Sequence, residues 1–201
     1  MKKRFLIVAV VLGMSAIGSA LENQAHGKRL EKATFAAGCF WCIQPPFDQT
    51  PGVVRTTVGY TGGTEPQPTY HQLGSGQTGH AESIEVVYNP AKVTYEKLLD
   101  VFWHNIDPTT KDRQFPDLGH QYRTAIFYHN EAQKRAATAS KEHWEKDGRF
   151  GARIVTEIVP ASTFWPAEDY HQKYYLKSPE DYHRYHDHSG REEYFRRIWG
   201  P

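Results

Sequence analysis

The chain has 201 residues, a formal net charge of +1 at pH 7 and a hydrophobic content of 39%. This length and composition allow one domain with a substantial core, and they argue against disorder outside the ends of the chain. The nearly balanced charge argues against nucleic acid or an anionic membrane surface as the main partner, because both need a clear excess of basic residues.

The first twenty residues have the pattern of a signal peptide. Lys2-Lys3-Arg4 precedes an apolar run over residues 5–17, and the small residues at 18–20 suit a signal peptidase. The run is too short to span a membrane, which takes about 20 apolar residues. We therefore expect a signal peptide at 1–20, a flexible leader at 21–31 and one domain at 32–201, in a periplasmic or secreted protein. A retained N-terminal anchor is the alternative.

Short strands and helices follow one another without an internal repeat. Runs of β-branched and aromatic residues predict strands at 32–38, 53–60, 81–88, 122–128 and 153–159. Helices are predicted over 40–49, after Thr94 to residue 103, over 130–146, and from a short start at 165–169. Loops rich in turn residues are expected at 61–79 and 108–120.

This order of elements predicts the fold class. Adjacent strands mixed with helical crossovers indicate an α+β, two-layer sandwich with a ferredoxin-like mixed sheet and helices on one face. A long irregular C-terminal region is expected beyond the last strand. A doubly wound sheet would need stricter alternation of strands and helices.

The only two cysteines, Cys39 and Cys42, lie where the first strand is expected to meet the first helix. A helix N-terminus favours the thiolate, which is the nucleophilic form of cysteine. Cys42 is one helical turn further on, where it could attack a sulfenic acid formed on Cys39 and close a disulfide. A structural disulfide over so short a loop would constrain the unfolded chain little. The spacing therefore favours redox chemistry.

Two other uses of a C-x-x-C pair are thioredoxin-type disulfide exchange and zinc binding. Zinc would need further ligands, and there is no second cysteine pair. His183, His186 and His188 are close in sequence, but their polar and aromatic neighbours indicate a solvated surface rather than a metal site. We expect no metal.

Six short motifs spread along the chain point to one family. They are Gly38-Cys39-Phe40-Trp41, Gly59-Tyr60-Thr61-Gly62-Gly63, Pro68-Thr69-Tyr70, Gly79-His80-Ala81-Glu82, Gln121-Tyr122-Arg123 and Pro166-Ala167-Glu168-Asp169-Tyr170-His171. With these six in this order, the sequence resembles the peptide methionine sulfoxide reductases of the A type over nearly all of the chain after the signal peptide.

The resemblance implies roles for the residues around the nucleophile. Cys39 would attack the sulfoxide sulfur, and Phe40 and Trp41 would form an apolar slot for the terminal methyl group of the substrate. Glu82 would protonate the sulfoxide oxygen. Removing that oxygen requires a proton donor, and a carboxyl group that apolar surroundings keep protonated can supply one.

Three further residues match the family by position. Tyr70 and Tyr122 match its oxygen-binding tyrosines, whose hydroxyl groups would polarise the sulfoxide. Asp117, five residues before Tyr122, matches its accessory carboxylate. From the residues alone, Glu82 could equally face solvent, and the tyrosines could be ordinary packing residues.

The chain departs from the common family pattern in two places. Many members have Gly after the Gly-Cys-Phe-Trp motif and Glu two places further on, where this chain has Cys42 and Gln44. Many also carry resolving cysteines in a C-terminal tail, and residues 178–201 contain none. Recycling must therefore use Cys42 or an external thiol.

The sequence thus predicts thiol-dependent reduction of methionine S-sulfoxide, free and in proteins, by a monomer. The resemblance implies a thioredoxin-like protein or another thiol as reductant, and no metal or organic cofactor. Two alternatives stay open: an exported thiol–disulfide oxidoreductase that uses the C-x-x-C pair, and a non-enzymatic domain with a structural cysteine bridge.

Overall fold

The computed structural model describes residues 30–200. The predicted signal peptide at 1–20 and nearly all of the leader lie outside the described residues. The first strand, β1 (Glu31–Ala37), begins one residue before its expected start. Within residues 30–200, no helix is both long and apolar enough to cross a membrane.

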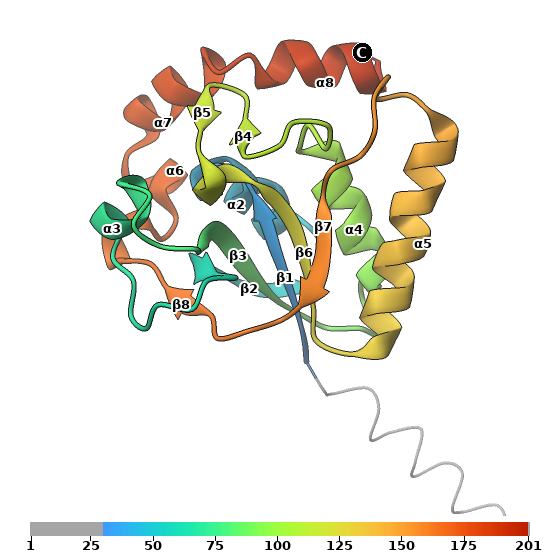
Figure 1. Ribbon diagram of the computed structural model, residues 1–201, viewed down its shortest axis with the longest axis horizontal. Helices are drawn as coiled ribbons and strands as arrows, with labels where there is room; N and C mark the ends of the chain where they lie inside the picture. Colours follow the sequence, from blue (N-terminus) through green and yellow to red (C-terminus); the bar gives the residue numbers. More distant parts are fainter. Residues whose placement is uncertain (1–29, 201) are drawn as a thin grey trace, which may run out of the picture.

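A six-stranded mixed sheet forms the centre of the molecule (Figure 1), with the strand order β7-β6-β1-β3-β2-β8. The four central strands, β6, β1, β3 and β2, are antiparallel to one another, whereas the edge strand β7 runs parallel to β6. Their order is that of a ferredoxin-like βαββαβ unit, so the predicted α+β fold is confirmed. The strands after β1 are β2 (Val53–Thr61), β3 (Ala81–Tyr88), β6 (Thr124–Tyr128), β7 (Glu157–Pro160) and β8 (Trp165–Pro166).

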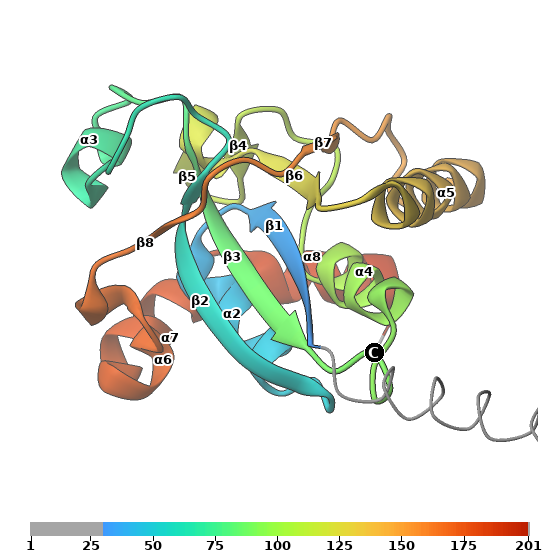
Figure 2. The same ribbon diagram turned by 90° about the horizontal axis from the view of Figure 1, so that it is seen from below.

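Two helices pack on one face of this sheet. They are α2 (Phe40–Asp48), which follows β1, and α4 (Tyr95–His104), which Thr94 caps with its side chain. A longer helix, α5 (Glu131–Asp147), packs against α4 and the β6 edge (Figures 1 and 2). The helix α2 accommodates Pro45 and Pro46 in its interior, which is possible because it is short and ends at Asp48.

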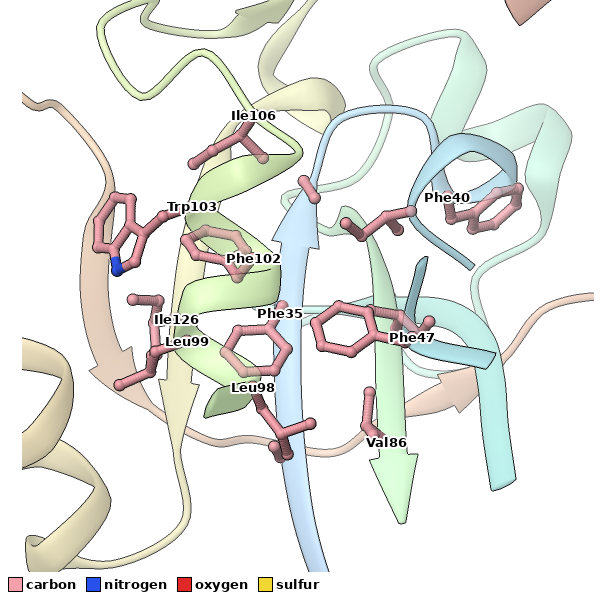
Figure 3. Close-up of a cluster of buried hydrophobic side chains, with 14 of the residues drawn as sticks. Phe35, Phe40, Phe47, Val86, Leu98, Leu99, Phe102, Trp103, Ile106 and Ile126 are labelled. Atoms are coloured by element: carbon pink, nitrogen blue, oxygen red, sulfur yellow. The ribbon is translucent and has the colours of Figure 1, made fainter. Parts of the chain in front are cut away.

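The core lies between the sheet and these two helices (Figure 3). Phe35 of β1 is completely buried and stacks on Phe47 of α2 and on Phe102 of α4, with ring centroids 5.2 Å apart in both pairs. These contacts fix α2 relative to the end of β1. The position of the cysteine pair therefore depends on the centre of the core.

The two predicted loops contain short elements. The helix α3 (Tyr70–Gly74), capped by Thr69, lies within the loop at 61–79. A small hairpin of β4 (Arg113–Gln114) and β5 (Asp117–Leu118) lies within the loop at 108–120. A single 3₁₀ turn, His120–Tyr122, then leads into β6.

The helix predicted from residues 165–169 is wrong at its start. Trp165 and Pro166 form β8, which pairs with the edge of β2 beside Gly59. A Cβ at Gly59 would overlap the backbone oxygen of Trp165 and lie 2.6 Å from the ring of Phe164. Only glycine allows this approach, and the sequence does not show which segment will come close.

The C-terminal region was expected to be irregular, and this detail is also wrong. It contains three short helices, α6 (Tyr174–Lys177), α7 (Pro179–Asp187) and α8 (Arg191–Trp199). Pro179 opens α7 with two acidic residues behind it, which suits a helix N-terminus. Gly190, with φ of +80°, makes the left-handed turn that starts α8. Because these helices consist mostly of polar residues, hydrophobic periodicity in the sequence does not predict them.

Candidate active site

The cysteine pair sits at a tight turn between β1 and α2. Gly38 has φ of +74°, and a Cβ there would lie 2.7 Å from Cγ of Gln114 and closer still to its Cβ. Glycine is therefore required at this position both by the backbone and by its neighbour. The turn places Cys39 at the N-cap of α2, as predicted, and the backbone N–H of Cys42 donates to its carbonyl oxygen at 3.1 Å.

Both thiols are buried and are not joined by a disulfide. Cys39 is 6% exposed and Cys42 is 8% exposed. Burial is the main cause that raises the pKa of Cys39 well above its ordinary value, and the adjacent Cys42 raises this pKa further. The guanidinium of Arg191 acts in the opposite direction and lowers the pKa of Cys39.

Glu82 of β3 points to the start of α2. Its Oε2 accepts a hydrogen bond of 2.9 Å from the backbone N–H of Phe40, one of the helix N–H groups that has no partner inside the helix. Glu82 is only 2% exposed. Burial, followed by the nearby Cys39, raises the pKa of this carboxyl well above its usual range. The site therefore holds a protonated carboxyl group next to a potential nucleophile.

The two aromatic residues after Cys39 lie in different surroundings. Phe40 is 1% exposed, with its ring 5.0 Å from that of His171. Trp41 is half-buried and stacks on Tyr174, with ring centroids 3.9 Å apart. Its indole N–H donates to Nδ1 of His171 at 3.0 Å. An aromatic wall is therefore present beside Cys39, and the C-terminal region supplies half of it.

His171 serves to hold this wall in place. Burial lowers its pKa to about 4, so the ring is neutral at pH 7 and Nδ1 can accept the indole N–H. The ring also lies 4.4 Å from that of Tyr70. His171 ends the last of the six motifs, but its sequence context does not indicate this supporting role.

Tyr70 and Tyr122 come together near Glu82, although one lies in α3 and the other in the turn before β6. Both are half-buried, and burial raises the pKa of each phenol. After burial, the nearby carboxyl group of Glu82 is the next cause in both cases. The two phenols are therefore protonated donors on the same side of the site as the carboxyl group.

Glu168 orients Tyr70. Its Oε1 accepts from the backbone N–H of Tyr70 at 3.0 Å, and its Oε2 accepts from the hydroxyl of Tyr60 at 2.6 Å. These hydrogen bonds join α3 to the segment after β8. Glu168 belongs to a motif quoted above, but its supporting role comes from a contact across almost one hundred residues.

Asp117 is engaged by the C-terminal helices. Its Oδ2 accepts from Nη2 of Arg191 at 3.2 Å and from the hydroxyl of Tyr185. Its charge also raises the pKa of Cys39 and of Glu82, which places it at the same site. Nothing in the sequence singled out Tyr185 or Arg191, because they lie some seventy residues from Asp117.

The histidines at 183, 186 and 188 lie outside this site. His183 and His186 both lie next to Asp187 on α7, and the side chain of His183 is 66% exposed. Over residues 30–200, no group of three or more histidine, cysteine or acidic side chains could hold a metal ion.

A buried thiol pair at a helix N-terminus, a protonated carboxyl group and two phenols together define a thiol-dependent oxidoreductase that can protonate its substrate. The family model for peptide methionine sulfoxide reductase matches residues 31–201. The chain therefore belongs to the peptide methionine sulfoxide reductase family. Its activity is the thiol-dependent reduction of peptide-methionine (S)-S-oxide, and a general thiol–disulfide oxidoreductase is not favoured.

Curated relatives and solved structures agree with this. The chain is 61% identical to the peptide methionine sulfoxide reductase MsrA of Methanosarcina acetivorans, over 78% of this chain and 82% of that one. It is 50% identical to the peptide methionine sulfoxide reductase MsrA of Halalkalibacterium halodurans, over 86% of this chain and 98% of that one. The methionine sulfoxide reductase A structure of Corynebacterium diphtheriae matches with a TM-score of 0.72 and 38% identity, over 77% of this chain and 78% of that one. The structure of reduced Mxr1 of Saccharomyces cerevisiae matches with a TM-score of 0.71 and 35% identity, over 76% of this chain and 87% of that one.

Proposed function

We propose that Cys39 reduces methionine S-sulfoxide, in proteins and as the free amino acid, with Glu82 as proton donor. The sulfur of Cys39 attacks the sulfoxide sulfur while Glu82 protonates its oxygen. The hydroxyl group then passes from the substrate sulfur to the Cys39 sulfur. The sulfur–oxygen bond of the substrate and the newly formed sulfur–sulfur bond both break, so methionine leaves and Cys39 becomes a sulfenic acid. The proton of the Cys39 thiol replaces the one that Glu82 gives. The observation that carries this proposal is the buried Glu82 carboxyl, hydrogen-bonded to the backbone of the residue that follows Cys39.

The surrounding residues bind the two ends of the sulfoxide group. The hydroxyls of Tyr70 and Tyr122 donate hydrogen bonds to the oxygen, where negative charge develops. Phe40 and Trp41 face the methyl group. Asp117 acts indirectly, since its carboxylate holds Tyr185 and Arg191 beside the cysteine pair.

Recycling uses Cys42. Its thiolate attacks the sulfur of the Cys39 sulfenic acid, a disulfide forms, and hydroxide leaves and is protonated to water. A thioredoxin-like dithiol then reduces this disulfide, and no metal or organic cofactor takes part. Mxr1 in complex with Trx2, which matches with a TM-score of 0.52 and 28% identity, supports a thioredoxin-like partner. We propose that the enzyme acts as a monomer and serves protein repair.

The test is the amount of methionine formed per enzyme, measured without reductant and again with thioredoxin. We expect Cys39→Ser to form none in either case. Cys42→Ser should form one methionine per enzyme in both cases, because without a disulfide thioredoxin has nothing to reduce, whereas the unsubstituted enzyme should cycle when thioredoxin is present. Mass spectrometry should locate a Cys39–Cys42 disulfide in the unsubstituted enzyme after one turnover. Full thioredoxin-driven cycling by Cys42→Ser would rule out the resolving role.

We propose further that the catalytic domain at 32–201 is exported and that residues 1–20 are removed. The supporting observation is the basic and then apolar pattern of this segment. The N-terminal sequence of the protein recovered from its native compartment tests this. A chain beginning near Leu21 is expected, and a chain that still begins at Met1 in the cytoplasm would contradict it.

A further inference from the structure

Arg191, the first residue of α8, carries a positive charge into the active site. It is only 2% exposed, and a charged side chain is rarely buried so completely unless it is paired. Its guanidinium lies 4.7 Å from the ring of Phe115 and 5.6 Å from that of Tyr185. Among residues 30–200, the carboxylate that it pairs with is that of Asp117, at 3.2 Å.

The pairing of this charge is incomplete. Asp117 also accepts a hydrogen bond from Tyr185, so its carboxylate is shared. Nη1 of Arg191 is buried, yet it has no hydrogen-bond partner among the described residues. A buried donor without a partner is destabilising, and more so when the group is charged. An anion that forms during the reaction would satisfy this donor.

The groups around Arg191 show which anion that is. They are Cys39 at the N-cap of α2, Cys42 of α2, Asp117 of β5 and Tyr185 of α7. The charge of Arg191 also acts on Glu82 of β3 and Tyr182 of α7. Burial raises the pKa of both tyrosines, so they stay protonated. Glu82 is held protonated as well. Besides the already paired Asp117, the thiols are therefore the groups that become anionic.

The influence between Arg191 and the thiols is mutual. Of the charges that raise the pKa of Arg191, that of Cys42 is the largest. In turn, Arg191 lowers the pKa of Cys39, against the effect of burial. The backbone hydrogen bond between Cys42 and Cys39 keeps both thiols on the same turn. Trp41, which lies on that turn, has its ring 6.2 Å from the ring of Tyr185, and the guanidinium of Arg191 lies 5.6 Å from the same Tyr185 ring.

We propose that Arg191 is a positioning residue that stabilises the thiolate form of the Cys39–Cys42 pair, above all Cys42 as it attacks the sulfenic acid. The C-terminal region, which contains no cysteine, thus assists recycling by its charge. In this step the Cys42 sulfur bonds to the Cys39 sulfur, the sulfur–oxygen bond breaks, and the departing hydroxide takes a proton. This use of the thiolate rests on the proposed function above.

The test measures the thiolates directly and needs no sulfoxide. Alkylation by iodoacetamide is followed against pH by mass spectrometry, with Cys42 observed in a Cys39→Ser background and Cys39 in a Cys42→Ser background. Arg191→Met should raise the midpoint for Cys39 and slow the alkylation of both thiols at pH 7 about tenfold, because an opposite charge nearby shifts a pKa by about 1–3 units. Arg191→Lys should restore part of this rate, since it keeps the charge and loses the planar fork.

Arg196→Met is the matched control, because Arg196 is an exposed arginine on the same helix. It should leave the midpoint for Cys39 and the alkylation rates of both thiols unchanged. Circular dichroism and thermal unfolding establish that each variant is folded, and Arg191→Gln, which keeps polar donors, replaces Arg191→Met if the latter does not fold. An unchanged midpoint for Cys39 and unchanged alkylation rates in a folded, neutral variant would overturn the proposal. That result would leave one-turnover sulfoxide reduction intact, so it is distinguishable from failure of the proposed function.

Discussion

Glu82 combines a catalytic advantage with a disadvantage for stability. Its pKa in the folded protein lies well above the ordinary value of 4.5, because burial disfavours the carboxylate. In the unfolded chain the same group ionises near its ordinary value. Above that pH, the folded state therefore binds more protons than the unfolded state, and the free energy of unfolding falls as pH rises.

We expect Glu82→Gln to make the protein inactive and more stable. The amide oxygen can still accept from the N–H of Phe40, but no ionisable group remains to favour the unfolded state at high pH. Urea unfolding at pH 4 should give similar stabilities for the two proteins, whereas at pH 8 the variant should be the more stable. Its rate of sulfoxide reduction should fall by about 10²–10⁴-fold, the usual contribution of a general acid.

Glu85→Gln on the same strand is the control. Glu85 forms an ion pair of 2.9 Å with Lys32, whose side chain is 54% exposed, so its loss should change stability by at most about 1 kcal/mol. Activity should be unchanged. If Glu82→Gln loses stability equally at both pH values, the carboxyl group is not held protonated in the folded state.

At this scale, the sequence predicts residues whose role lies in a local motif. Cys39 and Cys42 are recognisable from their spacing, and Glu82 from the motif that it ends. His171 and Arg191 act through contacts made only after folding, with Trp41 and Asp117 respectively. No local pattern announces such contacts, because the partner is more than seventy residues away.

At the level of elements, periodicity and capping residues predict most of the sheet and its helices. The β-branched run at 53–60 forms β2, and Asn130 caps α5 with its side chain as Thr94 caps α4. β8 and the C-terminal helices were missed, because they are held by neighbours rather than by their own composition. β8 depends on the missing side chain at Gly59.

Gly38→Ala is expected to destabilise the protein by more than its backbone conformation alone would. A residue that has a Cβ and adopts the left-handed conformation lowers the free energy of unfolding by about 1–2 kcal/mol. At Gly38 the new methyl group also overlaps the side chain of Gln114, which is completely buried and hydrogen-bonded to Asp107. The turn must then shift, and Cys39 moves with it. We therefore also expect at least a tenfold lower rate of sulfoxide reduction, because small displacements at a reacting atom are costly.

Gly148→Ala gives a closely matched comparison. Gly148 ends α5 with the same φ of +74°, but nothing lies within 4 Å of a Cβ placed there. Urea unfolding should show the loss of about 1–2 kcal/mol from conformation alone, with unchanged activity. Equal losses of stability in the two variants would mean that the side chain of Gln114 moves aside at no energetic cost. The turn at Gly38 would then not be tightly constrained.

Residues 30–200 form a sheet core and a C-terminal region, which is held to the core by polar contacts and by a few aromatic pairs such as Trp41 on Tyr174 and Trp144 beside Trp199. The core is centred on stacked aromatic rings (Figure 3). By contrast, Tyr182 is the only buried residue of α7, and Arg191 is the only one of α8. Opening of a protein is local where few apolar contacts hold a segment. The C-terminal helices should therefore open more readily than the sheet, although they carry part of the active site.

Asp117→Asn tests this division. The substitution removes the charge that Arg191 and Tyr185 share, and a hydrogen bond to a charged group contributes about 1.5–3 kcal/mol. By hydrogen–deuterium exchange, amides of α7 and α8 should exchange about 10–100-fold faster, while those of β1 and β3 keep their protection. Asp112→Asn in the same loop is the control, because Asp112 pairs with the exposed His120. Faster exchange throughout the sheet as well would show that the C-terminal helices and the core open as one unit.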